Sequence, residues 1–165
     1  MGRPSWEADF IEFYHARCPS LRRTAYAMCG DWAQADDLVQ HTFTRLYSHW
    51  PRIKGDRPDG YARRTLVNQL LNGRRSSRRE TLTDQMPAAA STGEDPGDRL
   101  DLLDAMRELP PRQRAIIALR YLDDLSVADT AQLLGMAEGT VKSQTARAIA
   151  TLRGRLSSAA ETDRT

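Results

Sequence analysis

Arginine and asparagine side chains recur at helical spacing in the stretch YARRTLVNQLLNGRRSSRRE, residues 61–80. Guanidinium groups bind phosphates or stack on bases, and amide groups hydrogen-bond to base edges. If the stretch is one helix, several of these side chains lie within about 80° of one another around its axis: Arg64, Asn68, Asn72, Arg75 and Arg79. The alternative is a solvated helix end whose arginines interact with the helix dipole. We interpret the shared face as a contact with nucleic acid.

Gly73 interrupts this face and decides how far it extends. Glycine in a helix interior costs about 1 kcal/mol relative to alanine, so the helix could end there. In that case Arg75, Arg78 and Arg79 would hold backbone phosphates, and Asn68 would read bases without them. The residues alone leave both versions open.

A second pattern, LSVADTAQLLGMAEGTVKSQTARAIATLRGRL at residues 125–156, has the spacing of a helix-turn-helix. Counted from Val127, the fifth position is Ala131, the ninth is Gly135 and the fifteenth is Val141. These are the small, turn and apolar sites that two crossed helices need to pack closely, and the glycine permits a positive φ in the turn. A plain helical hairpin is the alternative. The polar side chains that face outward near the start of the second helix suit a major groove: Thr140, Ser143 and Arg147, flanked by Lys142 and Gln144.

The segment TLTDQMPAAASTGEDPGD, residues 81–98, divides the 165-residue chain. It has two prolines, two glycines and no helical apolar period, which indicates a flexible linker. Both flanking parts have helical periodicity without strand-like alternation. The sequence therefore predicts an all-α fold of two small helical domains joined by this linker, with a helix-turn-helix in the second domain.

Breaks in the pattern set the expected helices. Before the linker, Gly30-Asp31 and the Pro- and Gly-rich segment Pro51–Gly60 should separate three or four helices. After it, we expect helices over Leu100–Leu109 and Pro111–Tyr121, followed by two shorter ones after Asp124.

Residues that usually carry catalysis or metal binding show no suitable pattern. The two Asp-Asp pairs point their carboxylates in different directions on a helix, and the three histidines lack metal-ligand spacing. Cys18 and Cys29 would stand about 16 Å apart on one helix, beyond disulfide reach, and read as small core residues. We therefore expect no enzyme activity, no metal and no cofactor.

The charge is small in sum and uneven along the chain. The net charge is +2, yet residues 61–79 hold six arginines and no acid, whereas residues 81–104 hold six acids against one arginine. This asymmetry favours a nucleic-acid partner. Because no apolar run approaches the roughly 20 residues that cross a bilayer, and the first residues lack a signal-peptide pattern, we expect a cytoplasmic protein without a membrane partner.

Several motifs in sequence resemble one family. ADDLVQHTF at residues 35–43, the stretch ending in RRSSRR, LPPRQRAIIALRYLDDLS at residues 109–126 and the helix-turn-helix occur in the order seen in the extracytoplasmic-function (ECF, group 4) sigma factors of the sigma-70 family. The resemblance implies an RNA polymerase sigma factor that directs promoter-specific initiation. It divides the chain into region 2 at residues 5–80, which binds core polymerase and reads and melts the −10 element, an acidic linker at 81–98, and region 4 at 99–158, which reads the −35 element.

The resemblance also implies roles for individual residues. Those expected to dock on the clamp of the largest polymerase subunit are Asp37, Leu38, Gln40, Thr42 and Phe43. Those expected at the −10 element are Lys54, Arg57, Tyr61, Arg64, Asn68, Asn72, Arg75, Arg78 and Arg79. Those expected at the −35 element are Glu138, Thr140, Lys142, Ser143, Gln144 and Arg147. The resemblance implies that the loop Pro51–Gly60 captures a flipped-out base. From the residues themselves, we expect the nearby rings of Trp50 and Tyr61 to stack on an unpaired base.

The implied partners are core RNA polymerase, including the flap of its second-largest subunit, and promoter DNA at the bacterial nucleoid; an anti-sigma factor is a further candidate. Many members carry tryptophan in place of Tyr61 and arginine in place of Gln144, so the resemblance leaves the promoter sequence open. A helix-turn-helix regulator without sigma activity is the competing hypothesis. It would leave ADDLVQHTF and the linker unexplained.

Overall fold

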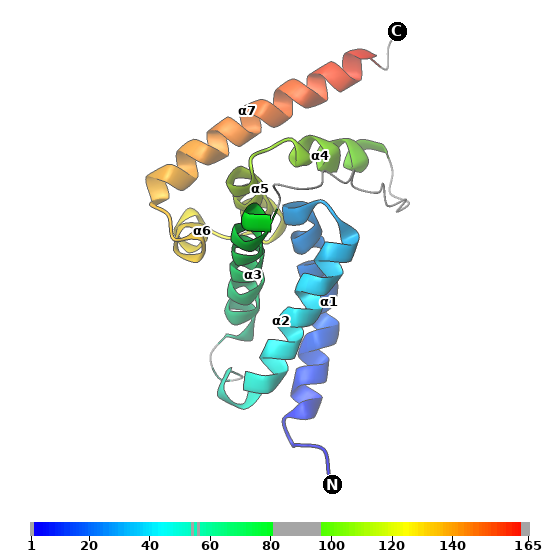
Figure 1. Cartoon of the computed structure of the whole chain (residues 1–165), viewed down its shortest axis with the longest axis vertical. Helices are drawn as coiled ribbons and strands as arrows, with labels where there is room; N and C mark the ends of the chain where they lie inside the picture. Colours follow the sequence, from blue (N-terminus) through cyan, green and yellow to red (C-terminus); the bar gives the residue numbers. More distant parts are fainter. Residues whose placement is uncertain (1, 54, 56, 81–96, 163–165) are drawn as a thin grey trace. The chain divides into compact units, whose positions relative to one another are not determined.

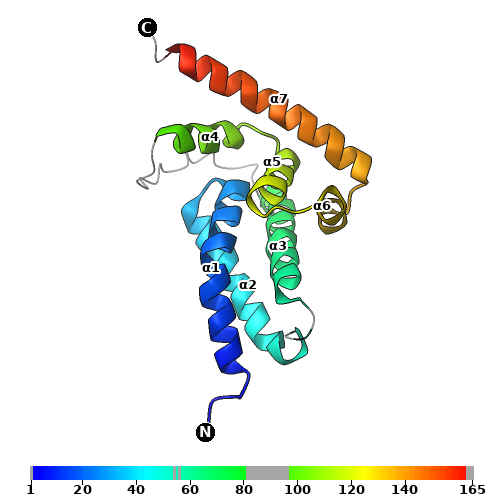
Figure 2. The ribbon, with the colours of Figure 1, turned by 180° about the vertical axis from the view of Figure 1, so that it is seen from behind.

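The computed structural model describes residues 2–53, 55, 57–80 and 97–162, without the side chains of residues 74–80 and 97–101. All regular structure in these residues is helical (Figure 1, Figure 2). The elements are α1 (Glu7–Cys29), α2 (Trp32–Ile53), α3 (Pro58–Glu80), α4 (Gly97–Arg107), α5 (Pro111–Ile117), the π-helix η1 (Ala118–Leu122), α6 (Val127–Leu134) and α7 (Glu138–Thr162).

The chain divides into two compact units, residues 1–26 with 31–89 and residues 27–30 with 90–165. The predicted all-α fold of two helical domains is thereby confirmed. Among the described helices, none combines the length and apolar character that crossing a bilayer requires. The predicted linker falls almost wholly outside the described residues, although its last two positions already belong to α4.

The core of the first unit is aromatic and lies between α1 and α2. The Trp50 ring lies 5.2 Å from the Phe10 ring and 5.1 Å from the Phe13 ring, centroid to centroid, and only 3% of Trp50 is exposed. The expectation that Trp50 stacks on a flipped base is therefore wrong. Trp50 follows Phe43 and Leu46 on the buried face of α2, where helical periodicity directs it inward.

The connection between α2 and α3 is shorter than the predicted loop Pro51–Gly60. Pro51 lies inside α2, which continues to the buried Ile53, and Pro58 occupies the first position of α3. Proline is tolerated there because the first helical N–H groups have no intrahelical partner.

α3 runs without a break from Pro58 to Glu80. Gly73 is exposed in its interior, and the backbone stays helical beyond it. The alternative in which the helix ends at Gly73 is therefore excluded, and positions 75 and 79 keep the helical register of Asn68.

The second unit contains the predicted helix-turn-helix. Ile116, Ala131 and Val141 form a buried cluster that joins α5, α6 and α7. The Ser126 hydroxyl caps α6 by accepting a hydrogen bond from the Asp129 backbone N–H at 3.0 Å.

Gly135 ends α6 with φ 63° and ψ 40°, the left-handed turn that the spacing predicted. Two lengths differ from expectation. α5 gives way to a π-helix after Ile117, and α7 has 25 residues instead of being short. α7 is supported along this length by packing against α4 and by an ion pair between Arg155 and Glu108, the residue that follows α4.

Candidate functional site

The polar face predicted on α3 is observed for those of its residues whose side chains the structure describes. Arg64, Asn68 and Asn72 are exposed, whereas Leu66 and Val67 between them are each only 1% exposed. α3 packs against α2 through this apolar side. The amide and guanidinium groups are thereby directed to solvent. The side chains of Arg75, Arg78 and Arg79 lie outside the described residues.

The start of α3 brings together two more of the predicted residues. The Arg57 carbonyl accepts hydrogen bonds from the backbone N–H groups of Gly60 and Tyr61, at 3.2 and 3.4 Å. Arg57 itself is exposed and has a positive φ of 53°, which is uncommon outside glycine. Tyr61 is half-buried, with its ring 6.4 Å from that of His49. Lys54 lies outside the described residues.

A bidentate ion pair holds this end of α3 in place. Arg17 on α1 bonds to Asp59 in the first turn of α3, with Nε 2.7 Å from Oδ1 and Nη2 3.0 Å from Oδ2. The pair is not apparent from the sequence, because its partners are 42 positions apart. It fixes the position of the exposed α3 face relative to α1.

The five residues expected to dock on polymerase divide into two groups. Asp37 and Gln40 are exposed on α2, and Leu38 is half-buried. Thr42 and Phe43 are core residues, 0% and 4% exposed. The Thr42 hydroxyl donates a hydrogen bond to the Leu38 carbonyl at 2.8 Å. Thr42 and Phe43 therefore pack beneath the exposed side of α2 that carries Asp37 and Gln40.

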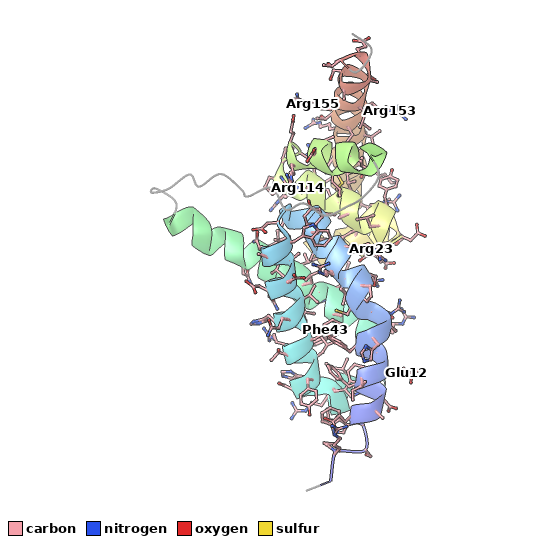
Figure 3. All side chains as sticks on the ribbon, turned by 90° about the vertical axis from the view of Figure 1, so that its right-hand side faces the viewer. Glu12, Arg23, Phe43, Arg114, Arg153 and Arg155 are labelled. Carbon is pink, nitrogen blue, oxygen red and sulfur yellow. The ribbon has the colours of Figure 1, made fainter. Side chains whose placement is uncertain are left out.

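A groove of about 640 Å³ lies between α1 and α2, next to Gln40. Phe43, labelled in Figure 3, lines the groove from α2. It packs edge-on against Tyr14 of α1, with ring centroids 4.8 Å apart. Tyr14 and Tyr47 line the groove and are 38% and 40% exposed. A hydrogen bond to Cys18 raises the pKa of Tyr14. The partial exposure of both tyrosines depends on how α1 and α2 pack, which helical periodicity does not give.

Arg22 and Asp36 also line this groove. The Arg22 guanidinium hydrogen-bonds to Asp36 and so lowers the pKa of that carboxyl. It also lies 4.3 Å from the centre of the Trp32 ring, and Tyr26 stacks on that ring at 3.9 Å. Asp36 is thus engaged within its own unit. Its neighbour Asp37 remains on the surface.

The start of α7 presents the polar face predicted for the second helix of the helix-turn-helix. Val141 and Ala148 are 0% exposed and fix the helix on its apolar side. The exposed residues are Glu138, Thr140, Lys142, Ser143 and Arg147. Gln144 is half-buried, and its Oε1 accepts a hydrogen bond from Gln113 Nε2 of α5 at 2.9 Å.

Comparison with known proteins covers both units. Residues 13–80 match the family "Sigma-70 region 2", and residues 99–152 match "Sigma-70, region 4". An RNA polymerase sigma-E factor of Streptomyces avermitilis is 36% identical over 91% of this chain and 86% of its own length. The ECF RNA polymerase sigma factor SigL of Mycobacterium tuberculosis is 37% identical over 85% of this chain and 84% of its own.

A solved structure is also similar. It is the sigma factor RpoE in complex with the anti-sigma factor NepR, from Bartonella quintana. Its TM-score is 0.79 at 26% identity, and the match covers 90% of this chain and 97% of that one. The order of the motifs, the helical units and these matches agree. The chain belongs to the extracytoplasmic-function sigma factors of the sigma-70 family and has the function of an RNA polymerase sigma factor in transcription initiation.

Proposed function

We propose that the two units divide promoter recognition between them. Region 2, at residues 5–80, binds core polymerase and reads and melts the −10 element, while region 4, at residues 99–158, reads the −35 element; residues 81–98 join them. The observation that carries the −10 assignment is the continuity of α3 through Gly73. It puts the exposed asparagines and the arginine run on one helix.

At the −10 element, α3 and the turn before it act on opened DNA. Extruding a base costs a few kcal/mol of stacking, so the protein must bind the unpaired strand. Asn68 and Asn72 offer amides to base edges, and Tyr61 offers a ring to a flipped base. The cations hold phosphates: Lys54, Arg57, Arg64, Arg75, Arg78 and Arg79.

Core polymerase binds the exposed part of α2. Asp37 and Gln40 make polar contacts with the clamp of the largest subunit, and Leu38 adds an apolar one. The aromatic groove adjoins Gln40, so an apolar side chain of the same polymerase surface fills it. Thr42 and Phe43 act only by supporting this surface.

At the −35 element, the start of α7 enters the major groove. Polar groups for base edges come from Thr140, Ser143 and Gln144 on the face that enters the groove. Positive charge for bases or phosphates comes from Lys142 and Arg147. Glu138 is a candidate acceptor for a cytosine amino group. The second unit also meets the flap of the second-largest polymerase subunit.

The chain acts in the bacterial cytoplasm, at the nucleoid, as a member of group 4 without catalytic activity of its own. An anti-sigma factor is a further partner, supported by the similar sigma factor that was solved with NepR. A helix-turn-helix regulator without sigma activity is disfavoured because it would leave the region 2 match unexplained.

Transcription from matched duplex and pre-melted templates tests the −10 assignment. Asn68→Ala should impair open-complex formation on duplex DNA, and a pre-melted template should restore part of the activity. Glu12→Ala, an exposed change on α1, is the control and should be neutral. If Asn68→Ala abolished transcription on both templates, the residue would have no specific role in opening. If transcription were unchanged on both templates, the −10 assignment would be contradicted.

A further inference from the structure

The Gln113–Gln144 hydrogen bond fixes which end of the Gln144 amide faces outward. Gln113 lies on α5 and donates through Nε2 to Oε1 of Gln144 at 2.9 Å. Both residues are half-buried, and the buried contact of Ile116 with Val141 holds α5 against α7 beside them. The carbonyl end of Gln144 is therefore turned toward α5, which leaves Nε2 as its free end.

This orientation restricts the chemistry of Gln144. A glutamine amide has one acceptor oxygen and an NH₂ group with two donors. Bidentate recognition of adenine needs both, because the oxygen must accept from N6 while the NH₂ group donates to N7. An amide oxygen can accept two hydrogen bonds, so the bond from Gln113 does not saturate it. Because that bond turns the oxygen toward α5, the NH₂ group is the end that Gln144 presents at the surface of α7.

The surroundings of Gln144 on α7 also favour acceptors. Thr140 and Arg147 lie four residues before it and three after it, so both share its side of the helix. Both are exposed. α7 has no acidic residue between Glu138 and Glu161.

We infer that Gln144 contacts DNA as a hydrogen-bond donor to an acceptor atom and that Gln113 is the positioning residue that sets this polarity. The inference rests on the proposed reading of the −35 element by α7. The acceptor is either a base-edge atom, such as guanine N7 or O6 or thymine O4, or a phosphate oxygen. The bidentate contact with adenine, in which the glutamine oxygen accepts from N6, is disfavoured at Gln144.

The first test removes the donors without adding charge. The probe is the duplex that the wild-type full chain enriches from a randomised DNA pool, and fluorescence anisotropy measures its affinity. Gln144→Met should weaken binding about tenfold. Gln144→Lys, which offers donors and no acceptor, should keep the affinity at or above that of the wild type. The matched control, Gln34→Met, alters an exposed glutamine of the first unit and should be neutral.

The source of the acceptor follows from modified probes. For a base-edge contact, one 7-deazaguanine, one 2-aminopurine in place of guanine, which lacks O6, or one thymine lacking O4 should weaken the wild type about tenfold and leave Gln144→Met unchanged. For a phosphate contact, one uncharged methylphosphonate should do the same. Either result supports the inference, and the absence of both contradicts it.

The second test releases the Gln144 oxygen. Gln113→Ala should weaken binding to the enriched probe about threefold. For a base-edge contact, it should also admit adenine at a position where the wild type excludes it. Thermal denaturation monitors folding of each variant. Wild-type affinity for both Gln144→Met and Gln113→Ala would overturn the inference.

Arg147→Ala separates this inference from the proposed function of α7. If Arg147→Ala weakens binding and Gln144→Met does not, then α7 reads DNA without the donor role of Gln144. If neither variant changes the affinity, the −35 assignment of α7 fails as well.

Discussion

Arg22 and Asp36 join α1 to the second turn of α2 through two hydrogen bonds, from Nε to Oδ1 and from Nη2 to Oδ2, the latter at 3.2 Å. The pair crosses the turn at Gly30-Asp31 and stands beside the exposed Asp37. Because Arg22 also lies over Trp32, the first turns of α2 are tied to α1 by a charge pair and an aromatic contact together. The first turns of α2, next to the residues proposed to bind polymerase, are therefore held in place against α1.

The Arg22–Asp36 pair should make stability depend on pH. Because the pKa of Asp36 is lowered in the folded chain, its contribution is present above the ordinary value of 3.8 and is lost as pH falls through the lower folded-state value. Both side chains are about half exposed, so the contribution should stay below about 1 kcal/mol. Urea denaturation of the wild type and Asp36→Asn should differ at pH 6 and converge as the solution is acidified. A difference that grows on acidification would contradict the assignment.

Gly135→Ala should destabilise the second unit. Its φ of 63° is in the left-handed region, which costs an L-residue about 1–2 kcal/mol. A Cβ at this position would meet no atom within 4 Å, so the loss would be conformational and not steric. Gly154→Ala is the matched control, because it adds the same methyl group inside α7, also in open space, and should stabilise by about 0.5–1 kcal/mol. Equal effects in thermal denaturation would contradict the turn geometry.

Gly73→Ala tests the continuity of α3. The helix passes through Gly73 and a Cβ there would meet open space, so alanine should stabilise it by about 1 kcal/mol and leave promoter opening intact. Gly73→Pro should interrupt the helix and reduce binding to pre-melted −10 DNA. Circular dichroism and DNA binding measure the two effects. If proline were as well tolerated as alanine, the arginine run would not depend on the helix.

Substitutions of core residues of α2 should lower stability, whereas substitutions of its surface residues should lower affinity for core polymerase. Phe43→Ala removes a buried ring that packs on Phe10 and Tyr14 and should lower the free energy of unfolding by about 3–5 kcal/mol. Gln40→Ala and Asp37→Ala should keep the stability and lose affinity for core polymerase in a pull-down at moderate salt. Normal polymerase binding by both surface variants would place the docking surface elsewhere.

The helix-turn-helix was predictable because each constrained site depends on local chemistry. Gly135 supplies the turn, and Ala131 and Val141 supply close packing, all within 15 positions. Trp50 was misjudged because an aromatic next to a Pro- and Gly-rich segment resembles a loop residue until the register of α2 is known. The Gln113–Gln144 bond spans 31 positions and involves two polar residues without periodicity, so only tertiary packing reveals it.

Arg147→Ala should weaken −35 binding, whereas Arg153→Ala should not. Both arginines are exposed on α7, and Figure 3 shows Arg153 on the later part of the helix. At about 1.5 Å per residue, Arg153 lies about 20 Å along the axis from Thr140, farther than the roughly 12 Å width of the major groove. Removing the charge at Arg147 should reduce affinity for a −35 duplex about tenfold and lower the salt dependence, while the same change at Arg153 keeps both. Equal losses from the two variants would mean that the positive charge of α7 as a whole, and not the contact made by its first turns, determines the affinity.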